Sequence, residues 1–306
     1  MLGRPVILGL VAMLVGTPAC AQGTPIPESA EIPADQLAWT TACKDWDEWE
    51  KPAPPFRVHG NTYHVGTCGI SVILVTTDAG HILIDTGTEG GALLVADNIA
   101  QVGFKLEDVR YILSSHEHFD HVGGMALLQD MTGAQVLASP AAAVALQTGD
   151  VSDEDPQHDS HPPLAPLKVD RILEGNMIVE LGDTRLLAFP TPGHTPGALS
   201  WRWQSCEGEA CQEIVYADSL SPVSDDGYRF SDHAFYLRSY RDGLARLRMN
   251  GGMGCNILLT PHPSASGMRD KLLASDVAAE PTCTAYADSI TARLDARLAE
   301  EAEGNP

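Results

Sequence analysis

Residues 116–121 read His-Glu-His-Phe-Asp-His. Four of these six side chains, His116, His118, Asp120 and His121, can bind a divalent transition metal, and imidazole nitrogens with a carboxylate are typical of zinc sites. Because His116 and His118 alternate along the chain, we expect them to point the same way. Asp120 and His121 lie further on and point elsewhere. The stretch therefore predicts two adjacent metal ions, an arrangement found in hydrolases.

The flanking sequence places this stretch at the end of a strand. Residues 109–113 form an apolar run typical of a buried strand, and an apolar segment typical of a helix start follows Gly123 and Gly124. Open sheets build their binding sites at the carboxyl ends of strands. This context disfavours the alternative of a solvated, histidine-rich loop that binds metal only by accident.

Two further histidines occur in a repeated context. His194 lies in Thr-Pro-Gly-His-Thr-Pro-Gly (191–197), and His262 lies in Thr-Pro-His-Pro (260–263), each after an apolar strand-like run. Proline and glycine restrict the backbone of such turns and hold a side chain in place before a ligand arrives. We therefore expect both histidines to bind metal.

These motifs resemble those of the metallo-β-lactamase superfamily, whose pattern is His-x-His-x-Asp-His followed by separated histidines. Ala-Asp-Ser-Leu-Ser (217–221) and Pro-His-Pro-Ser-Ala-Ser-Gly (261–267) make the chain most similar to subclass B3. The resemblance extends from about residue 49 to the C-terminal helix. It implies an α/β fold, the αββα sandwich, with two mixed sheets face to face and helices on the outer faces.

The resemblance also implies the ligand sets and the reaction. His116, His118 and His194 would hold the first zinc ion, and Asp120, His121 and His262 would hold the second, giving two zinc ions per chain. Asp120 would be the catalytic residue that orients a hydroxide bridging the metals. The implied activity is hydrolysis of the β-lactam amide bond, conferring resistance to a broad range of β-lactam antibiotics that includes carbapenems.

Several other residues match substrate-binding or supporting positions of B3 enzymes. Ser219 and Ser221 match serines that bind the substrate carboxylate in place of a lysine, and no Lys or Arg occurs between Gln204 and Gly227. Gln157 matches a loop position that lines the site in some members. Asp85 is expected to orient a ligand histidine rather than to bind metal. The remaining histidines are expected to be structural or exposed: His59, His64, His81, His158, His161 and His233.

The N-terminal sequence is typical of an exported protein. Residues 1–21 have a charged start, a short apolar run and the small-residue pattern Ala-Cys-Ala of a signal-peptide cleavage site, which predicts a periplasmic location. Lipidation at Cys20 is an alternative, although the preceding residues lack the expected leucine. We expect residues 22–42 to form an extended, Pro-rich arm and residues 43–306 to form one domain.

Six cysteines remain after removal of a signal peptide. An even number in an exported chain favours disulfides, and no Cys-x-x-Cys spacing supports a zinc knot. Closeness in sequence favours Cys206–Cys211. The B3 resemblance implies Cys255–Cys283 and, as in some members, Cys43–Cys68.

The net charge of the chain is −22. This charge disfavours nucleic acid and, once the signal is cleaved, an anionic membrane as partners. We expect a monomer whose partner is a small β-lactam. Scattered acidic residues, including Asp153, Glu154 and Asp155, are expected to be solvated.

Other functions remain open from the sequence. The superfamily also contains lactonases and thioesterases of the glyoxalase II type, and Asp218 falls near the position of the metal-bridging aspartate of the latter. A periplasmic zinc carrier without turnover is a further alternative. Three histidines on one ion, however, leave a coordination position open for chemistry.

The remaining pattern predicts the secondary structure. Helices are expected around 92–99, 237–247 and 286–298, where apolar residues recur at helical spacing. A hairpin is expected within 62–75, and a second sheet is expected from strands at 177–181, 185–189, 199–203 and 213–217. The segment 149–167 has no periodicity and is expected to be a mobile loop.

Overall fold

The computed structural model describes residues 1–3 and 31–304, and residues from Glu31 onward belong to one compact unit. Apart from residues 1–3, the expected signal peptide (1–21) lies outside the described residues, as does the first part of the expected arm (22–30). Within the arm, α1 (Ala34–Ala42) is a helix, so the expectation of extended chain is wrong over this stretch. The helix forms because Gln36, Trp39 and Thr40 share one face and are buried.

Two sheets form the centre of the molecule. The first has the strand order β1-β2-β3-β4-β5-β6-β7, and the second has the order β12-β11-β10-β9-β8. Their bounds are β1 (Phe56–His59), β2 (Thr62–His64), β3 (Ile73–Thr77), β4 (Gly80–Ile84), β5 (Val109–Leu113), β6 (Gln135–Ala138), β7 (Arg171–Ile172), β8 (Met177–Leu181), β9 (Thr184–Pro190), β10 (Leu199–Glu207), β11 (Ala210–Tyr216) and β12 (Ile257–Leu259). Both sheets are mixed, since β4 to β7 pair in parallel, as do β11 and β12, whereas the other pairs are antiparallel.

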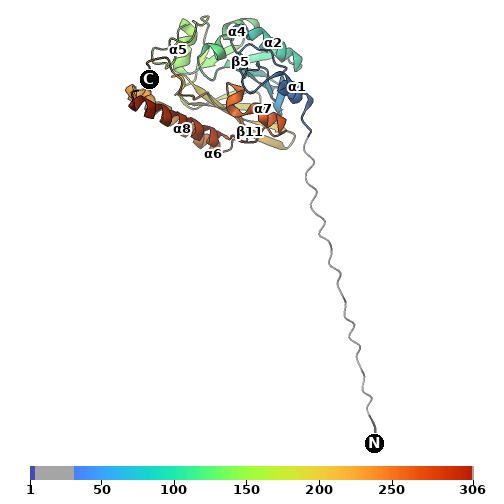
Figure 1. Ribbon diagram of the computed structural model, residues 1–306. Coiled ribbons are helices and arrows are strands. Elements are labelled where there is room, and N and C mark those ends of the chain that lie inside the picture. Colours follow the sequence, from blue (N-terminus) through green and yellow to red (C-terminus); the bar gives the residue numbers. More distant parts are fainter. Residues whose placement is uncertain (4–30, 305–306) are drawn as a thin grey trace. The chain divides into compact units, whose positions relative to one another are not determined.

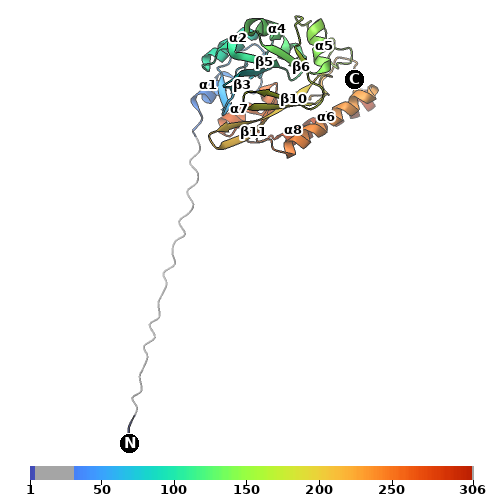
Figure 2. The same ribbon diagram turned by 180° about the vertical axis from the view of Figure 1, so that it is seen from behind.

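Helices cover both outer faces of this pair of sheets. In Figures 1 and 2, α2, α4 and α5 lie on one side of the sheets, and α6 and α8 lie on the other. The helix bounds are α2 (Ala92–Gln101), α3 (Phe119–Val122), α4 (Met125–Thr132), α5 (Pro140–Thr148), α6 (Ala234–Gly252), α7 (Met268–Leu273) and α8 (Cys283–Ala302), with short 3-10 turns at Leu106–Asp108, Phe230–Asp232 and Pro263–Ser266. None of the helices in the described part combines the length and apolar character needed to cross a bilayer. The expected αββα sandwich is confirmed.

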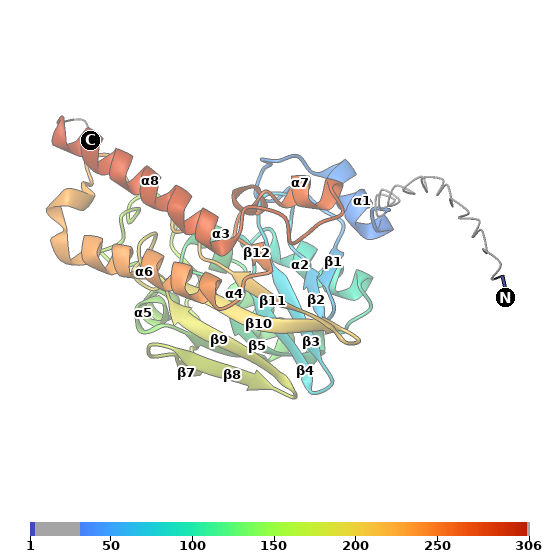
Figure 3. The same cartoon turned by 90° about the horizontal axis from the view of Figure 1, so that it is seen from below.

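The apolar residues separate into three layers that match this architecture. The central layer joins inward-facing residues of both sheets, for example Ile82, Ile84, Leu186 and Trp201, which are fully buried. A second layer lies between the first sheet and α2, α4 and α5, and a third lies between the second sheet and the pair α6 and α8, which run side by side in Figure 3. Strand β4 is buried along its whole length because both of its faces are covered.

Three disulfides connect segments of the fold. They are Cys43–Cys68, Cys206–Cys211 and Cys255–Cys283, the pairs expected from sequence locality and from the resemblance. The second closes the β10–β11 hairpin, and the third joins the segment before β12 to the first residue of α8. The start of α8 is thereby fixed against the second sheet.

His64 is a buried imidazole without a hydrogen-bond partner among the described residues. Its ring stacks on Phe56, with centroids 5.0 Å apart, and meets the edge of Trp39 at 5.9 Å. Burial lowers the pKa of His64 to about 3. In the unfolded chain the imidazole has its ordinary pKa of about 6.5 and takes up a proton as the pH falls. Because the folded state resists protonation of His64, acid favours the unfolded state.

We expect His64→Phe to protect the protein against acid. The folded state holds His64 neutral, so His64 does not reduce the free energy of unfolding above pH 6.5. Below that pH the unfolded chain is protonated at His64, and the free energy of unfolding falls until the pH reaches about 3. The loss is about 1 kcal/mol per pH unit within this window. Urea unfolding of both proteins between pH 7.5 and 4.5 measures the difference, with the exposed His233→Phe as the control. Parallel pH profiles for wild type and His64→Phe would contradict the prediction.

Candidate metal centre

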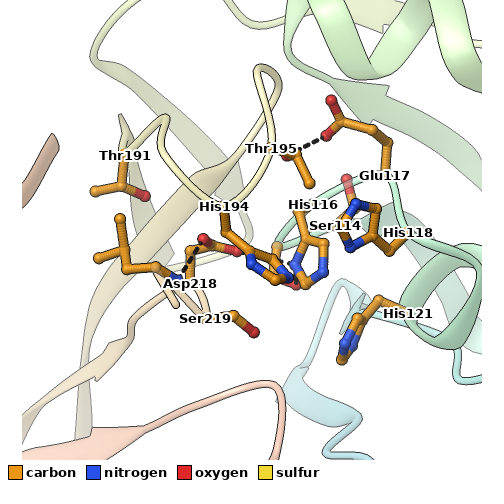
Figure 4. Close-up of polar contacts among 12 residues, drawn as sticks. Ser114, His116, Glu117, His118, His121, Thr191, His194, Thr195, Asp218 and Ser219 are labelled. Carbon is orange, nitrogen blue, oxygen red and sulfur yellow. Dashed lines mark hydrogen bonds and ion pairs between the residues drawn. The ribbon is translucent and has the colours of Figure 1, made fainter. Parts of the chain in front are cut away.

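The ligand loop begins where β5 ends. Ser114 and Ser115 close the strand, His116 to His118 form the loop, and α3 starts directly after His118. The backbone amides of His121 and Val122 donate to the carbonyl of His118, which turns the chain sharply. In Figure 4 the rings of His116 and His118 point into the space that His194 enters from the opposite side, with His121 close by.

His194 and His262 reach this space from the second sheet. His194 lies on the turn between β9 and β10, and His262 follows β12. Gly193, at φ +156°, has no room for a side chain, because an added Cβ would lie 2.2 Å from the Tyr240 ring. Sequence alone could suggest a rigid turn here, whereas the contact with Tyr240 on α6 is visible only in the fold.

The donor atoms form two overlapping groups. One atom each of His116, His118 and His194 lie within 4.8 Å of one another, and the same holds for His116, Asp120 and His121. His262 joins the second group through Asp120, whose Oδ2 lies 3.4 Å from His262 Nε2 and 3.0 Å from His121 Nε2. All six side chains expected as ligands are thus brought together.

Each of the five histidines has one ring nitrogen next to an oxygen outside the centre. The pairs are His116 Nδ1 with Asp218 Oδ1 (2.9 Å), His118 Nε2 with Asp155 Oδ2 (3.0 Å), His121 Nδ1 with Asp85 Oδ2 (3.5 Å), His194 Nδ1 with the Ser221 carbonyl (3.0 Å) and His262 Nδ1 with the Gly69 carbonyl (3.2 Å). Such outer contacts fix the ring orientation of metal-binding histidines. The other nitrogen of each ring is left for the centre.

The inner nitrogens explain what this centre can bind. Nε2 of His116 is buried and has no hydrogen-bond partner among the described residues, and Nε2 of His121 is buried and faces only Asp120 Oδ2 of the same centre. Buried polar atoms without partners are costly, and a cation that accepts their lone pairs removes that cost. The donor set of imidazoles and one carboxylate therefore fits a divalent metal.

Electrostatics favour the neutral, metal-binding form of most of these rings. Burial, together with neighbouring imidazoles, lowers the pKa of His194 to about 3 and that of His262 to about 4. The same two causes hold the pKa values of His116 and His118 well below the usual value for histidine. Metal binding requires neutral imidazole, so little proton release is needed at these four positions.

Asp120 and His121 behave as a charged pair when no metal is bound. Burial opposes the ionisation of Asp120, but the imidazoles of His121 and His262 outweigh it and hold the pKa of the carboxyl well below its usual range. Burial likewise opposes the charge of His121, but Asp120 and Asp85 raise its pKa to about 10. The centre thus keeps a permanent negative charge at Asp120, and His121 must lose a proton to bind metal.

Asp85 lies directly behind the ligand loop, where its predicted supporting role would require it. It is buried at φ +64°, an unusual conformation for a residue other than glycine. Its carboxylate accepts hydrogen bonds from the Ser115 amide (2.6 Å), the Ser115 hydroxyl (2.8 Å) and the Tyr216 hydroxyl (2.6 Å). These bonds hold the loop in place, and the strained backbone is compensated by them.

Glu117 points away from the imidazoles and links the two ligand segments. Its carboxylate accepts hydrogen bonds from the Thr195 hydroxyl (2.7 Å, Figure 4) and the Gly197 amide (2.8 Å). Burial, with Asp155 nearby, raises the pKa of Glu117 to about 7. The ligand loop and the His194 turn are therefore held together by a side chain that does not reach the centre.

A cleft of about 420 Å³ opens above the metal centre. Gln157, Ser219 and Ser221, expected to contact substrate, all line it. Gln157 Nε2 and Ser219 Oγ are buried and lack hydrogen-bond partners within the described residues. Both groups therefore have hydrogen-bonding capacity that no described residue uses.

Other residues of the cleft were not found from the sequence. Trp46 and Trp49 form part of the wall, and Trp46 stacks on His262 with centroids 5.8 Å apart. His161, expected to be structural or exposed, lines the cleft and stacks on His118 at 4.1 Å. Asp155, expected to be solvated, is instead buried against His118. An aromatic pair in an acidic segment and a histidine near Gln157 were the available signals, but only the folded loops bring them to the centre.

Comparisons with known proteins agree with this geometry. The family described as the metallo-beta-lactamase superfamily matches residues 65–207. The solved structure of MIM-2 metallo-beta-lactamase is 53% identical, with a TM-score of 0.82, and the match covers 88% of this chain and 98% of that one. The chain belongs to the metallo-β-lactamase superfamily. MEM-A1, a subclass B3 metallo-beta-lactamase from a soil metagenome library, is 38% identical over 84% of this chain and all of its own, with a TM-score of 0.78.

More distant relatives have other activities. Hydroxyacylglutathione hydrolase from Anaeromyxobacter dehalogenans is 34% identical over 172 residues, or 56% of this chain. The match spans only 53% of that protein, so the chain covers about half of the length of this curated relative. The solved metallo-β-lactamases are matched over nearly their whole length, and the subclass B3 resemblance is confirmed.

Proposed function

We propose that this metallo-β-lactamase hydrolyses the amide bond of β-lactam antibiotics with two zinc ions. The observation that carries the proposal is the convergence of five imidazoles and Asp120 beneath a cleft lined by Ser219 and Gln157, each of which has a buried polar atom without a partner among the described residues. Similarity to B3 enzymes over nearly their full length supports it.

In this proposal, His116, His118 and His194 hold one zinc ion, and Asp120, His121 and His262 hold the other. Three neutral imidazoles leave one coordination position open, as in other catalytic zinc sites. When bound, zinc supplies a Lewis acid for the lactam carbonyl and lowers the pKa of water to about 7.

The protein groups orient the reactants. The Asp120 carboxylate, only slightly exposed, accepts a hydrogen bond from the attacking water and directs it to the carbonyl carbon. The hydroxyls of Ser219 and Ser221 donate to the carboxylate of the substrate, and Gln157 contacts it from the 149–167 loop. Trp46 and Trp49 cover apolar parts of the substrate and limit the access of water. No side-chain nucleophile is required.

The glyoxalase II-like alternative depends on Asp218 as a metal ligand. In the structure Asp218 Oδ1 lies 2.9 Å from His116 Nδ1, whereas the nitrogen of that ring that faces the metal centre is Nε2. Asp218 is fully buried and does not line the cleft. A position on the outer side of His116 favours an orienting role and supports the lactamase over the thioesterase.

The proposal extends to the setting of the enzyme. Three disulfides fit an oxidising compartment, and a signal peptide at 1–21 would deliver a monomer to the periplasm, where β-lactams act on the cell. The proposed range of substrates is broad and includes carbapenems.

Hydrolysis of a chromogenic cephalosporin tests the function directly. We expect turnover by the purified protein, loss of at least about 100-fold of the rate after removal of metal with a chelator, and recovery as two equivalents of Zn²⁺ are added back. Zinc content and activity are measured on the same samples. Metal binding without hydrolysis of any β-lactam would favour the carrier, and hydrolysis of a lactone or thioester alone would favour the related hydrolases.

A further inference from the structure

The cleft contains a cation that the sequence did not associate with it. Arg293 is the only lysine or arginine among the described residues that line the cleft. It comes from α8, far in sequence from Ser219 and Ser221, which line the same space. The absence of Lys and Arg from 204–227 therefore does not leave the substrate-binding wall without a positive charge.

Helix α8 fixes the direction of Arg293. Tyr286, seven residues earlier, lies two turns away on the same face, and its hydroxyl donates to the carbonyl of Ser219 at 2.5 Å. Ile290 and Leu294 are buried and anchor the helix on the second sheet. Arg293 therefore emerges from a well-packed helix beside the Ser219–Ser221 segment.

The guanidinium of Arg293 has no partner within the described part of the chain. Three other arginines of α6 and α8 are paired with acids: Arg241 with Asp295, Arg248 with Asp288 and Arg297 with Glu301. Of the remaining two on α6, Arg246 donates to the Pro190 carbonyl, and Arg238 is exposed and has no ion pair among the described residues. With the described residues Arg293 forms neither a hydrogen bond nor an ion pair, although the chain carries 41 acidic residues. Its donors are available to a ligand in the cleft.

We propose that Arg293 is a specificity-determining residue that binds the carboxylate of the substrate together with Ser219 and Ser221. This inference rests on the proposed function. A guanidinium suits a carboxylate because it offers two parallel N–H donors. Ser219 Oγ, buried and without a partner, supplies a third donor on the same wall. The local cation also opposes the repulsion of anionic substrates by a protein of net charge −22.

The test compares one cephalosporin with its methyl ester, which has the same ring and no carboxylate charge. We expect Arg293→Met to lower kcat/KM about tenfold for the acid, mainly through KM, and less than about twofold for the ester. Arg293→Lys should restore part of the loss. Arg238→Met is the matched control, because Arg238 is exposed on α6, has no ion pair with any described residue and does not line the cleft. Raising the salt concentration should reduce the acid–ester difference in the wild type.

Binding of both compounds to the zinc-loaded proteins is measured by calorimetry in parallel. If Arg293→Met weakens acid and ester equally, or neither, the proposed role is wrong. If the wild type hydrolyses neither compound, the proposed function has failed, and the acid–ester difference in binding still decides the role of Arg293. Preferential loss of acid binding in Arg293→Met, absent in Arg238→Met, supports it.

Discussion

Alanine in place of His116 is expected to lower β-lactam turnover by a factor on the order of 10³ or more, equivalent to about 4 kcal/mol of transition-state stabilisation. The reason is geometric, because His116 belongs to both groups of converging donor atoms. Its loss removes an inner nitrogen from each group and leaves Asp218 Oδ1 and Ser115 Oγ without their ring contact. We expect zinc content to fall first at the position that His116 would hold with His118 and His194.

The measurement is kcat/KM for a chromogenic cephalosporin, with zinc content determined on the same dialysed sample. His233→Ala, which removes an exposed histidine outside the centre, is the control. Near-ultraviolet circular dichroism and thermal unfolding check that the fold survives the loss of a buried ring. A folded His116→Ala protein with full zinc content and wild-type turnover would show that the metal lies elsewhere.

The ligand residues of this centre were predictable because the local sequence around each of them identifies it. His116 to His121 are nearly consecutive ligands after β5, and His194 and His262 follow apolar strands of the second sheet on proline-rich turns, so their convergence required that these strand ends of the two sheets meet at one edge of the sandwich. The strands of the second sheet were predicted nearly in place for the same reason: their alternating pattern continues into β8 to β11.

Contacts between distant segments were not predictable in this way. Asp155 follows other acids in a polar loop, and only burial against His118 distinguishes it from Asp153. Arg293 lies on a helix whose apolar spacing was correctly interpreted, but Ser219 and Ser221, which line the same cleft, belong to a loop far from that helix in sequence. Helix α5 was missed although Ser139 and Pro140 form a typical helix start, because its alanine-rich sequence has no apolar periodicity.

Asparagine in place of Asp120 is expected to lower turnover about 100-fold to 1,000-fold while the first zinc position stays filled. The substitution keeps the size of the side chain and removes its charge. Asp120 Oδ2 lies between His121 Nε2 and His262 Nε2, so it is the only anionic donor in the second set. An amide oxygen is a weaker ligand for zinc and a weaker hydrogen-bond acceptor for water than a carboxylate.

The two roles of Asp120 can be separated by adding zinc. If the carboxylate only retains the second ion, excess Zn²⁺ should refill the site in Asp120→Asn and restore turnover. If it also directs the attacking water, turnover should stay low when two zinc ions are bound, and this is the result we expect. Asp153→Asn, with its side chain 99% exposed, removes the same charge from the protein surface and should retain wild-type kcat/KM and zinc content. Full activity of zinc-saturated Asp120→Asn would remove the orienting role, because the neutral amide would then serve as well as the charged group.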